Sequence, residues 1–239
     1  MGSRAGYARE RMILAATDIS GAIHILQRLG LDPQYAVMLA SIPIDRINIV
    51  RGNFKRTAVT CVAAFFGLAG LSPETIKLRI EELLKDHRYI FPANGDRLHL
   101  DQPFSQGAIS FILKEEVFTS ATFVTQNLER FPARSRKHPS ERELPDSMVA
   151  LAATAVYAAL VEYRATGRRQ NIAFTEDAYE ATYRNHMETL SQTRQSAPNS
   201  MHNILHRLFN DLTESEQVVH TASGSSATLI QLVDLSDSD

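Results

Sequence analysis

The chain has 239 residues, of which 44% are hydrophobic, and a formal net charge of -2 at pH 7. That length and apolar content suffice for one large domain with its own core. The near-neutral charge excludes a protein-wide field that would attract nucleic acid. The single cysteine, Cys61, excludes an intrachain disulfide, and the opening MGSRAGYARER lacks the apolar run of a secretory signal. We therefore expect an intracellular protein that does not cross a membrane.

Apolar residues recur at helical spacing through the first third of the chain. This spacing predicts helices over residues 8–29, 34–40, 47–65 and 73–86. Pro43 is expected to separate the second from the third. Ser72, followed by Pro73 and Glu74, is a strong N-terminal signal for the fourth, because serine caps helices and proline is favoured at the first helical position.

The hydrophobic period changes between residues 89 and 100. Two short extended runs, 89–92 and 97–100, flank the dipeptide Asn94-Gly95. An Asn-Gly pair between such runs is typical of a tight hairpin turn. We predict one small β-hairpin near residues 89–100.

The second half of the chain is organised around the stretch 144–170. From Ser147 to Val161 it carries no charge, and its apolar residues surround the helical wheel on every side. Such a helix must be covered all round, and an uncharged run shorter than about 20 residues is covered by protein rather than lipid. Asp146 is its expected N-cap. We predict an all-α fold of about eight helices around this Ala-rich helix, residues 147–164.

The remaining elements follow the same logic. Ser105 and Thr175 are expected helix caps, and the polar, Arg- and Lys-rich stretch 132–143 is expected to be a loop. A last amphipathic helix follows Pro198. We expect a flexible N-terminus over residues 1–8, a single helical domain over 9–212, and a disordered acidic tail over 213–239.

Several segments resemble a known family. They are ELPDSMVALAATAVYAALVEYRATGRRQ, FTEDAYEATYRNHMETL, FKRTAVTCVAAFFGL and SPETIKLRIEELLKDHRYIFP. Together they look like a helical domain of unknown function that is expanded in mushroom-forming basidiomycete fungi, over roughly residues 44–211. The resemblance implies a fungal, intracellular, mostly helical protein. It carries over no catalytic or binding residue.

The best metal-ligand spacing is His202 with His206, at i and i+4 on the last helix, with His186 as a third ligand only if two helices face each other. The glutamate of a metalloprotease helix is absent, and we interpret this pair as a solvated flank of the helix. No phosphate-binding loop or nucleophile elbow is present either. We predict no catalytic, cofactor or metal site.

Residues 55–100 allow a sharper hypothesis. Helix, turn, capped helix and hairpin follow one another as in a winged-helix DNA-binding module, with the helix over 73–86 as the reader of the groove. Its basic residues, Lys77, Arg79 and Lys85, are opposed by four acids, so it has no excess positive charge for phosphates. Nucleic-acid binding is therefore the alternative and not the favoured function.

The last eleven residues, 229–239, read LIQLVDLSDSD and resemble a SUMO-interacting motif. An extended apolar run adds to the edge of the modifier's sheet while neighbouring acids meet its basic residues. Phosphorylation of Ser236 would add about -1.5 to -2 charge. The predicted contact residues are Ile230, Leu232, Val233, Asp234, Leu235, Ser236 and Asp237. We favour a non-enzymatic protein-interaction protein in the nucleus, with SUMO or a SUMO-modified protein as its partner.

Overall fold

The computed structural model of the protein describes residues 33–95, 97–119 and 126–225, and the side chains within 47–95, 97–119 and 126–214. Its contacts divide the chain into two compact units, Met1–Asn53 and Phe54–Asp239. Helix α3, Pro33–Phe65, runs through the boundary between them. The predicted tail contacts at 230–237 lie outside the described residues.

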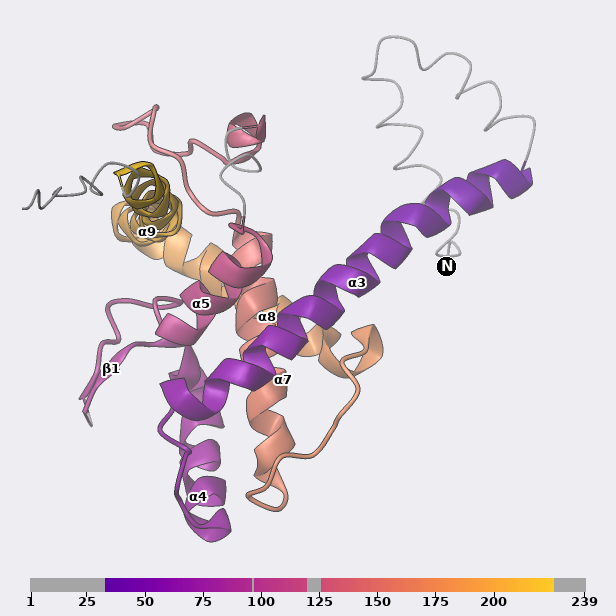
Figure 1. Ribbon diagram of the computed structural model, residues 1–239, viewed down its shortest axis with the longest axis vertical. Coiled ribbons are helices and arrows are strands. Elements are labelled where there is room, and N and C mark those ends of the chain that lie inside the picture. Colours follow the sequence, from indigo (N-terminus) through magenta and orange to yellow (C-terminus); the bar gives the residue numbers. More distant parts are fainter. Residues whose placement is uncertain (1–32, 96, 120–125, 226–239) are drawn as a thin grey trace, which may run out of the picture. The chain divides into compact units, whose positions relative to one another are not determined.

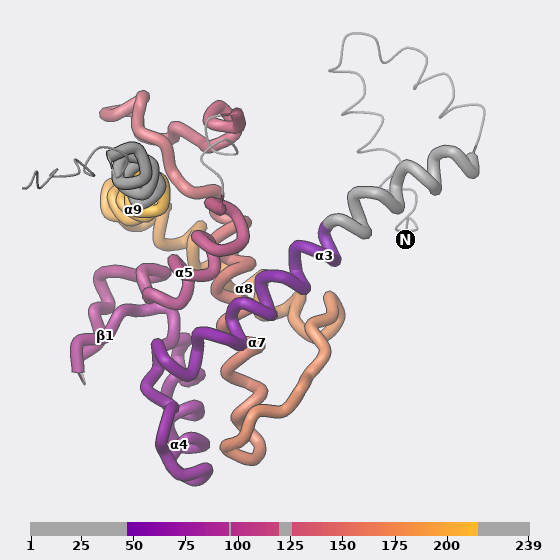
Figure 2. The backbone as a smooth tube through the Cα atoms, in the orientation of Figure 1, coloured from indigo at the N-terminus to yellow at the C-terminus, as the bar shows by residue number. Residues whose placement is uncertain are grey.

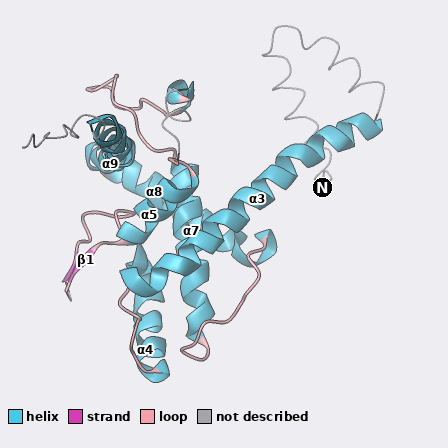
Figure 3. Cartoon of the chain, in the orientation of Figure 1, coloured by secondary structure: helices cyan, strands magenta, loops and turns pink. Residues whose placement is uncertain are grey.

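Where the structure describes the second unit, its regular elements are helices and one two-stranded hairpin (Figures 1 and 3). Its elements after α3 are α4 (Pro73–Leu84), the 3-10 segment η1 (Lys85–Ile90), β1 (Ala93–Asn94), β2 (Arg97–Leu98), α5 (Gly107–Glu116), η2 (Leu128–Arg130), α7 (Asp146–Arg164), α8 (Glu176–Ser196) and α9 (Pro198–Ser225). The predicted fold class is thus confirmed. The described residues form six α-helices, fewer than the eight predicted.

Part of the difference in helix count comes from α3. Two helices were predicted, over 34–40 and 47–65, and the structure has one continuous helix through Pro43. A proline removes its own N–H, and hence one helical hydrogen bond, but the residues on either side of it here keep the helical backbone. The prediction of a break at Pro43 was therefore wrong. The helix predicted over 8–29 lies outside the described residues.

Helix α7 is the centre of the second unit, as its sequence predicted. It contacts α4, α5 and α8, which surround it in Figure 1. Alanines at 152, 153, 155, 158 and 159 are fully buried, and their small side chains allow these neighbours to approach closely. Among the described helices, α7 alone is long and apolar enough to cross a membrane, but 61% of that stretch is buried inside the protein. It is a core helix.

Two of the predicted helix caps are confirmed. Ser72 Oγ accepts a hydrogen bond from the backbone N–H of Thr75 at 3.2 Å, and Thr175 Oγ1 accepts one from Ala178 at 3.4 Å. The ring of Phe174 lies 5.0 Å from that of Tyr179, so an apolar contact also fixes the start of α8. Polar residues placed before an amphipathic pattern therefore predicted the starts of α4 and α8.

Two other predicted caps were wrong by one residue each. Helix α5 is capped by Gln106, whose side chain accepts from the Ala108 N–H, and not by Ser105. Helix α7 begins at Asp146 with Pro145 before it, and no side-chain cap forms. The carboxylate of Asp146 binds arginine side chains instead, so it is not available to its own helix end.

The hairpin is smaller than predicted. Its strands pair Ala93 with Leu98 and Asn94 with Arg97, and the region before it forms η1 rather than an extended run. Tyr89 and Ile90 are buried in the core. The start of the predicted first strand is therefore part of the core and not of the hairpin.

Helix α9 presents the apolar face that the sequence predicted. Its buried residues are Met201, Ile204, Leu205, Leu208, Phe209 and Leu212. These residues close the core on the side of α5 and α8. The chain between η2 and α7 lies beside α9, as Figure 2 shows, and a backbone hydrogen bond joins Leu144 N to Leu205 O at 3.4 Å.

Gly167 is required where the chain leaves α7. Its φ is +67°, in the left-handed region, and its N–H donates to Tyr163 O at 2.8 Å. A Cβ at this position would lie 1.9 Å from the carbonyl oxygen of Pro73, the first residue of α4. Glycine therefore permits both the turn and the close approach of two segments.

The central position of α7 predicts that enlarging Ala155 or Ala159 destabilises the protein. Replacing either by leucine overpacks a filled contact and should lower the free energy of unfolding by about 1–3 kcal/mol. Ala181→Leu, at an exposed position on α8, is the matched control and should change it little. Chemical denaturation measures all three variants. Unchanged stability in both α7 variants would contradict the central role of this helix.

Gly167→Ala should be more harmful than the same change at Gly70. Both glycines have positive φ, but a Cβ at Gly70 meets nothing within 4 Å. The conformational cost of about 1–2 kcal/mol applies to both, and only Gly167→Ala adds the clash with Pro73. Thermal melting of the two variants separates the contributions, and equal losses would show that the close approach is unimportant.

Candidate functional site

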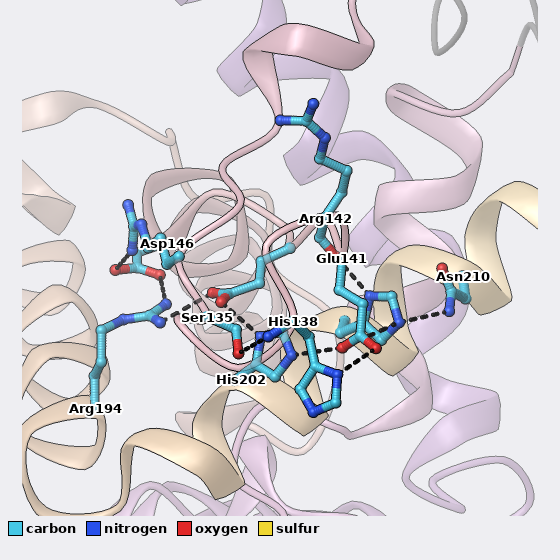
Figure 4. A network of polar contacts seen from close by, with 11 residues as sticks. Ser135, His138, Glu141, Arg142, Asp146, Arg194, His202 and Asn210 are labelled. Carbon is cyan, nitrogen blue, oxygen red and sulfur yellow. Dashed lines mark hydrogen bonds and ion pairs between the residues drawn. The ribbon is translucent and has the colours of Figure 1, made fainter.

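Charged and polar side chains gather where the loop before α7 meets α8 and α9 (Figure 4). The loop supplies Glu141 and Glu143, α7 begins with Asp146, α8 supplies Arg194, and α9 supplies His202. We call these five residues the His202 network. Glu143 and His202 are buried, so their charges are withdrawn from water.

Both ring nitrogens of His202 face carboxylates. Nδ1 lies 2.8 Å from Oε1 of Glu143, and Nε2 lies 2.7 Å from Oε2 of Glu141. An ionised carboxylate only accepts hydrogen bonds, so each nitrogen must carry a proton and the ring is an imidazolium. Burial lowers the pKa of His202, but the hydrogen bonds and charges of Glu143 and Glu141 outweigh it, and the net pKa is raised above 6.5.

Glu143 and Asp146 are bridged by Arg194. Its Nη1 lies 2.9 Å from Oε2 of Glu143, and its Nη2 lies 2.7 Å from Oδ1 of Asp146. Arg134 reaches the other oxygen of Asp146 at 2.8 Å. The last turn of α8 is thereby joined to the first turn of α7. A carboxylate in the first turn of a helix also interacts favourably with the helix dipole.

The imidazole rings of His138 and His206 both stack on that of His202. The His202 ring lies 6.1 Å from that of His138 and 5.6 Å from that of His206, with interplanar angles of 5° and 8°. His206 donates from Nδ1 to the carbonyl oxygen of Arg142 at 2.8 Å and accepts at Nε2 from Asn210 at 3.1 Å. Its two nitrogens are thus also committed to protein groups.

The interpretation of His202 as a solvated flank was wrong, because the residue is buried. A pattern of alternating acids, Glu141 and Glu143, was the available signal, but sequence alone does not say that the loop packs on α9. Among the residues that the structure describes, no group of three or more His, Cys, Asp or Glu side chains is arranged to hold a metal ion.

A second buried cluster surrounds Glu162 near the end of α7. Lys55 Nζ lies 2.5 Å from its Oε1, and Arg169 Nε lies 3.0 Å from its Oε2. The backbone N–H of Ile172 also donates to Oε1, at 3.2 Å. Burial raises the pKa of Glu162, but the hydrogen bonds from Lys55, Arg169 and Ile172 prevail and lower it. The cluster joins α3, α7 and the connection to α8.

A third cluster is centred on His186 of α8. Its Nε2 lies 2.6 Å from the hydroxyl of Tyr89, and its Nδ1 lies 2.9 Å from Oγ1 of Thr154, which donates to Ala150 O at 2.7 Å. Because that donation uses the only hydroxyl proton of Thr154, Nδ1 carries the proton of a neutral ring, and Tyr89 donates to Nε2. Burial, with the nearby His87, lowers the pKa of His186 to about 3.

Strained backbone lies next to this neutral histidine. Within the described residues, positive φ at non-glycine positions occurs at Asp86, His87 and Phe104, with values of 52°, 55° and 62°. The rings of His87 and Phe104 lie 5.7 and 6.0 Å from that of His186. Such conformations persist only where the surrounding structure holds them. Here the ring contacts with His186 hold His87 and Phe104 in these conformations.

The three clusters share one chemical property. Each buried charge or ring nitrogen in them is paired with a protein group that comes from a different element of the fold. They are therefore suited to fixing helices in register and to responding to protonation. The sequence did not predict them, since each pairs residues that are distant along the chain.

In the segment proposed as a winged helix, the helix, turn, capped helix and hairpin follow one another as predicted, and the apolar face of α4 is buried as its spacing predicts. Ile76, Ile80 and Leu83 of α4 are buried toward α7. On its outer side Glu82 binds both Arg79 and Arg88, each at 3.2 Å. The carboxylate of Glu82 therefore offsets part of the positive charge of these two arginines.

Comparison with known proteins gives one match. Residues 5–193 match a family described as "Domain of unknown function (DUF6532)". The match confirms the predicted resemblance to a domain of unknown function, and it ends before Arg194 and α9. No curated protein and no solved structure matches the chain.

The environment of His186 predicts acid sensitivity. Its folded pKa is about 3 against 6.5 for the free side chain, so its contribution is present above 6.5 and is lost as the pH falls toward 3. The loss should reach at most about 1.4 kcal/mol per pH unit. His186→Gln keeps a polar side chain that does not titrate and should flatten this slope in urea unfolding. The same slope in both proteins would contradict the assignment.

Proposed function

The chain belongs to the DUF6532 family, and we propose that it is a non-enzymatic protein-interaction protein of the nucleus. Its proposed partner is SUMO or a SUMO-modified protein, bound by residues 229–239. We also propose a basidiomycete source, on the resemblance of the stretches around 44–211. The helical unit would then act as the scaffold that carries the binding segment.

The apolar stripe of α3 is the structural observation that carries the interaction role. In the second unit this stripe is buried, with Phe54 2% exposed and Ala58 fully covered. One and two turns earlier, in the first unit, Val50 is 45% exposed and Ile47 is 54% exposed. Exposed apolar side chains that continue a buried stripe are typical of a surface that receives another protein.

The sequence of the tail indicates the proposed partner. Ile230, Leu232 and Val233 supply apolar side chains in a short run, and Asp234 and Asp237 place negative charge beside them. Addition of such a strand to a sheet edge uses main-chain hydrogen bonds for affinity and alternate side chains for specificity. Ordering of the tail on binding opposes association, so an affinity on the order of micromolar is expected.

Nucleic-acid binding through residues 55–100 stays a prediction and ranks below protein interaction. The pairing of Arg79 and Arg88 with Glu82 reduces the positive charge that α4 offers to phosphates. If DNA is nevertheless bound, the affinity should weaken steeply with salt and should be lost on Lys77→Glu with Arg79→Glu.

Titration of a labelled peptide 226–239 with SUMO tests the proposal. The wild-type peptide should bind at roughly micromolar concentration, and the Leu232→Ala, Val233→Ala peptide should lose that binding because its apolar contacts are gone. The matched control is the Thr228→Ala peptide, which is changed only before the apolar run and should bind as wild type. No binding of the wild-type peptide at hundreds of micromolar would remove SUMO as the partner.

A further inference from the structure

Two imidazoles of α9 contact the loop before α7: His206 hydrogen-bonds the carbonyl oxygen of Arg142, and His202 makes the closest contacts to residues 135–141. Within residues 135–141, Glu141 contacts His202 by a hydrogen bond of 2.7 Å and His206 by a longer ion pair of 3.8 Å, and His138 stacks on the His202 ring. Arg134, just before this stretch, contacts Asp146 of α7 instead. The attachment of residues 135–141 to α9 thus depends on the state of His202.

We propose that protonated His202 is a pH-sensitive latch, which holds residues 135–141 against α9 and releases them when the imidazole loses its proton. The inference does not depend on the proposed function. It follows from the two carboxylates on one ring, since a neutral imidazole has one proton and can donate to only one of them.

The two carboxylates are not equivalent, and this decides which contact breaks. Glu143 is fully buried and holds a second cation, Arg194, on its other oxygen. Glu141 is 32% exposed, and its neighbours are His138 at 3.3 Å, His202 at 2.7 Å and His206 at 3.8 Å. Glu141 can return to water while Glu143 cannot. Neutral His202 therefore keeps its proton on Nδ1 toward Glu143 and releases Glu141.

The charged and titratable groups around His202 come from the loop, the segment before α7, α8 and α9. The loop contributes His138 and Glu141, the segment before α7 contributes Glu143, α8 contributes Arg194 through Glu143, and α9 contributes His206. Arg194 is neutralised between Glu143 and Asp146, so it does not cancel the effect of Glu143 on the ring.

The direction of the pH dependence follows from the two shifts. The pKa of His202 is raised above 6.5, so the latch is fully formed below that value and is lost as the pH rises through the folded pKa. The pKa of Glu141 is lowered from 4.5, chiefly by its hydrogen bond to His202, so this carboxylate stays ionised in mild acid. The latch is closed in the window between the two.

Hydrogen exchange of the full chain tests the latch. Exchange of residues 135–141 is measured at about pH 5.5 and about pH 8.5, and each rate is corrected for the intrinsic pH dependence of exchange. Protection should be lower at the higher pH, by roughly tenfold for each unit by which the folded pKa of His202 exceeds 6.5. A histidine proton titration of the same protein supplies that pKa.

Glu141→Gln is the decisive variant. A glutamine amide accepts from a protonated ring or donates to a neutral one, so residues 135–141 should stay equally protected at both pH values. Glu129→Gln, at an exposed position on η2, is the matched control and should behave as the wild type. Equal protection of the wild-type loop at both pH values, or the same loss in Glu141→Gln, would overturn the proposal.

Discussion

Helix α7 has no charge between Ser147 and Val161, and it must therefore be enclosed by protein along its whole length. The rest of the second unit follows from this requirement. Helices α4, α5 and α8 pack on α7, and α9 completes the core over α5 and α8. The alanine side chains of α7 are small, so these helices can come close to it. The helix itself adds little bulk to the core, but it determines where the other helices lie.

Each end of α7 carries a carboxylate that binds two basic side chains. At its start Asp146 binds Arg134 and Arg194, and near its end Glu162 binds Lys55 and Arg169. In both cases one carboxylate receives two cations, and one of the two comes from a helix distant along the chain, Arg194 for Asp146 and Lys55 for Glu162. Removing one partner of such a buried pair is strongly destabilising, because the other charge is left without compensation. The two clusters therefore fix the position of α7 along its axis, which apolar contacts alone do not fix.

Two histidines of one small unit are held in opposite states by their surroundings. His186 hydrogen-bonds to the hydroxyls of Tyr89 and Thr154, and burial, with the nearby His87, keeps it neutral. His202 is also buried but lies between two carboxylates, which keep it protonated. Histidine thus acts as a neutral hydrogen-bonding group in the core, at His186, and as a titratable contact to a loop, at His202.

The sequence predicted what depends on neighbours along the chain. Periodicity predicted the apolar faces of α4 and α9, and capping residues predicted the starts of α4 and α8. It failed in two places where tertiary contacts decide: Asp146 binds arginines instead of capping α7, and Tyr89 enters the core instead of a strand. It also predicted a helix break at Pro43, through which α3 continues. The histidine and glutamate clusters could not be predicted, since His202 and Glu143 are 59 positions apart.

Native-state hydrogen exchange of α7 tests the central claim most directly. If α7 is enclosed on all sides, its amides between Val149 and Leu160 should exchange only through global unfolding. Their free energies of opening should then equal the free energy of unfolding measured with denaturant. Exchange of these amides at lower free energy than those of α4 or α8 would show that the other helices can persist without it, and would contradict the account.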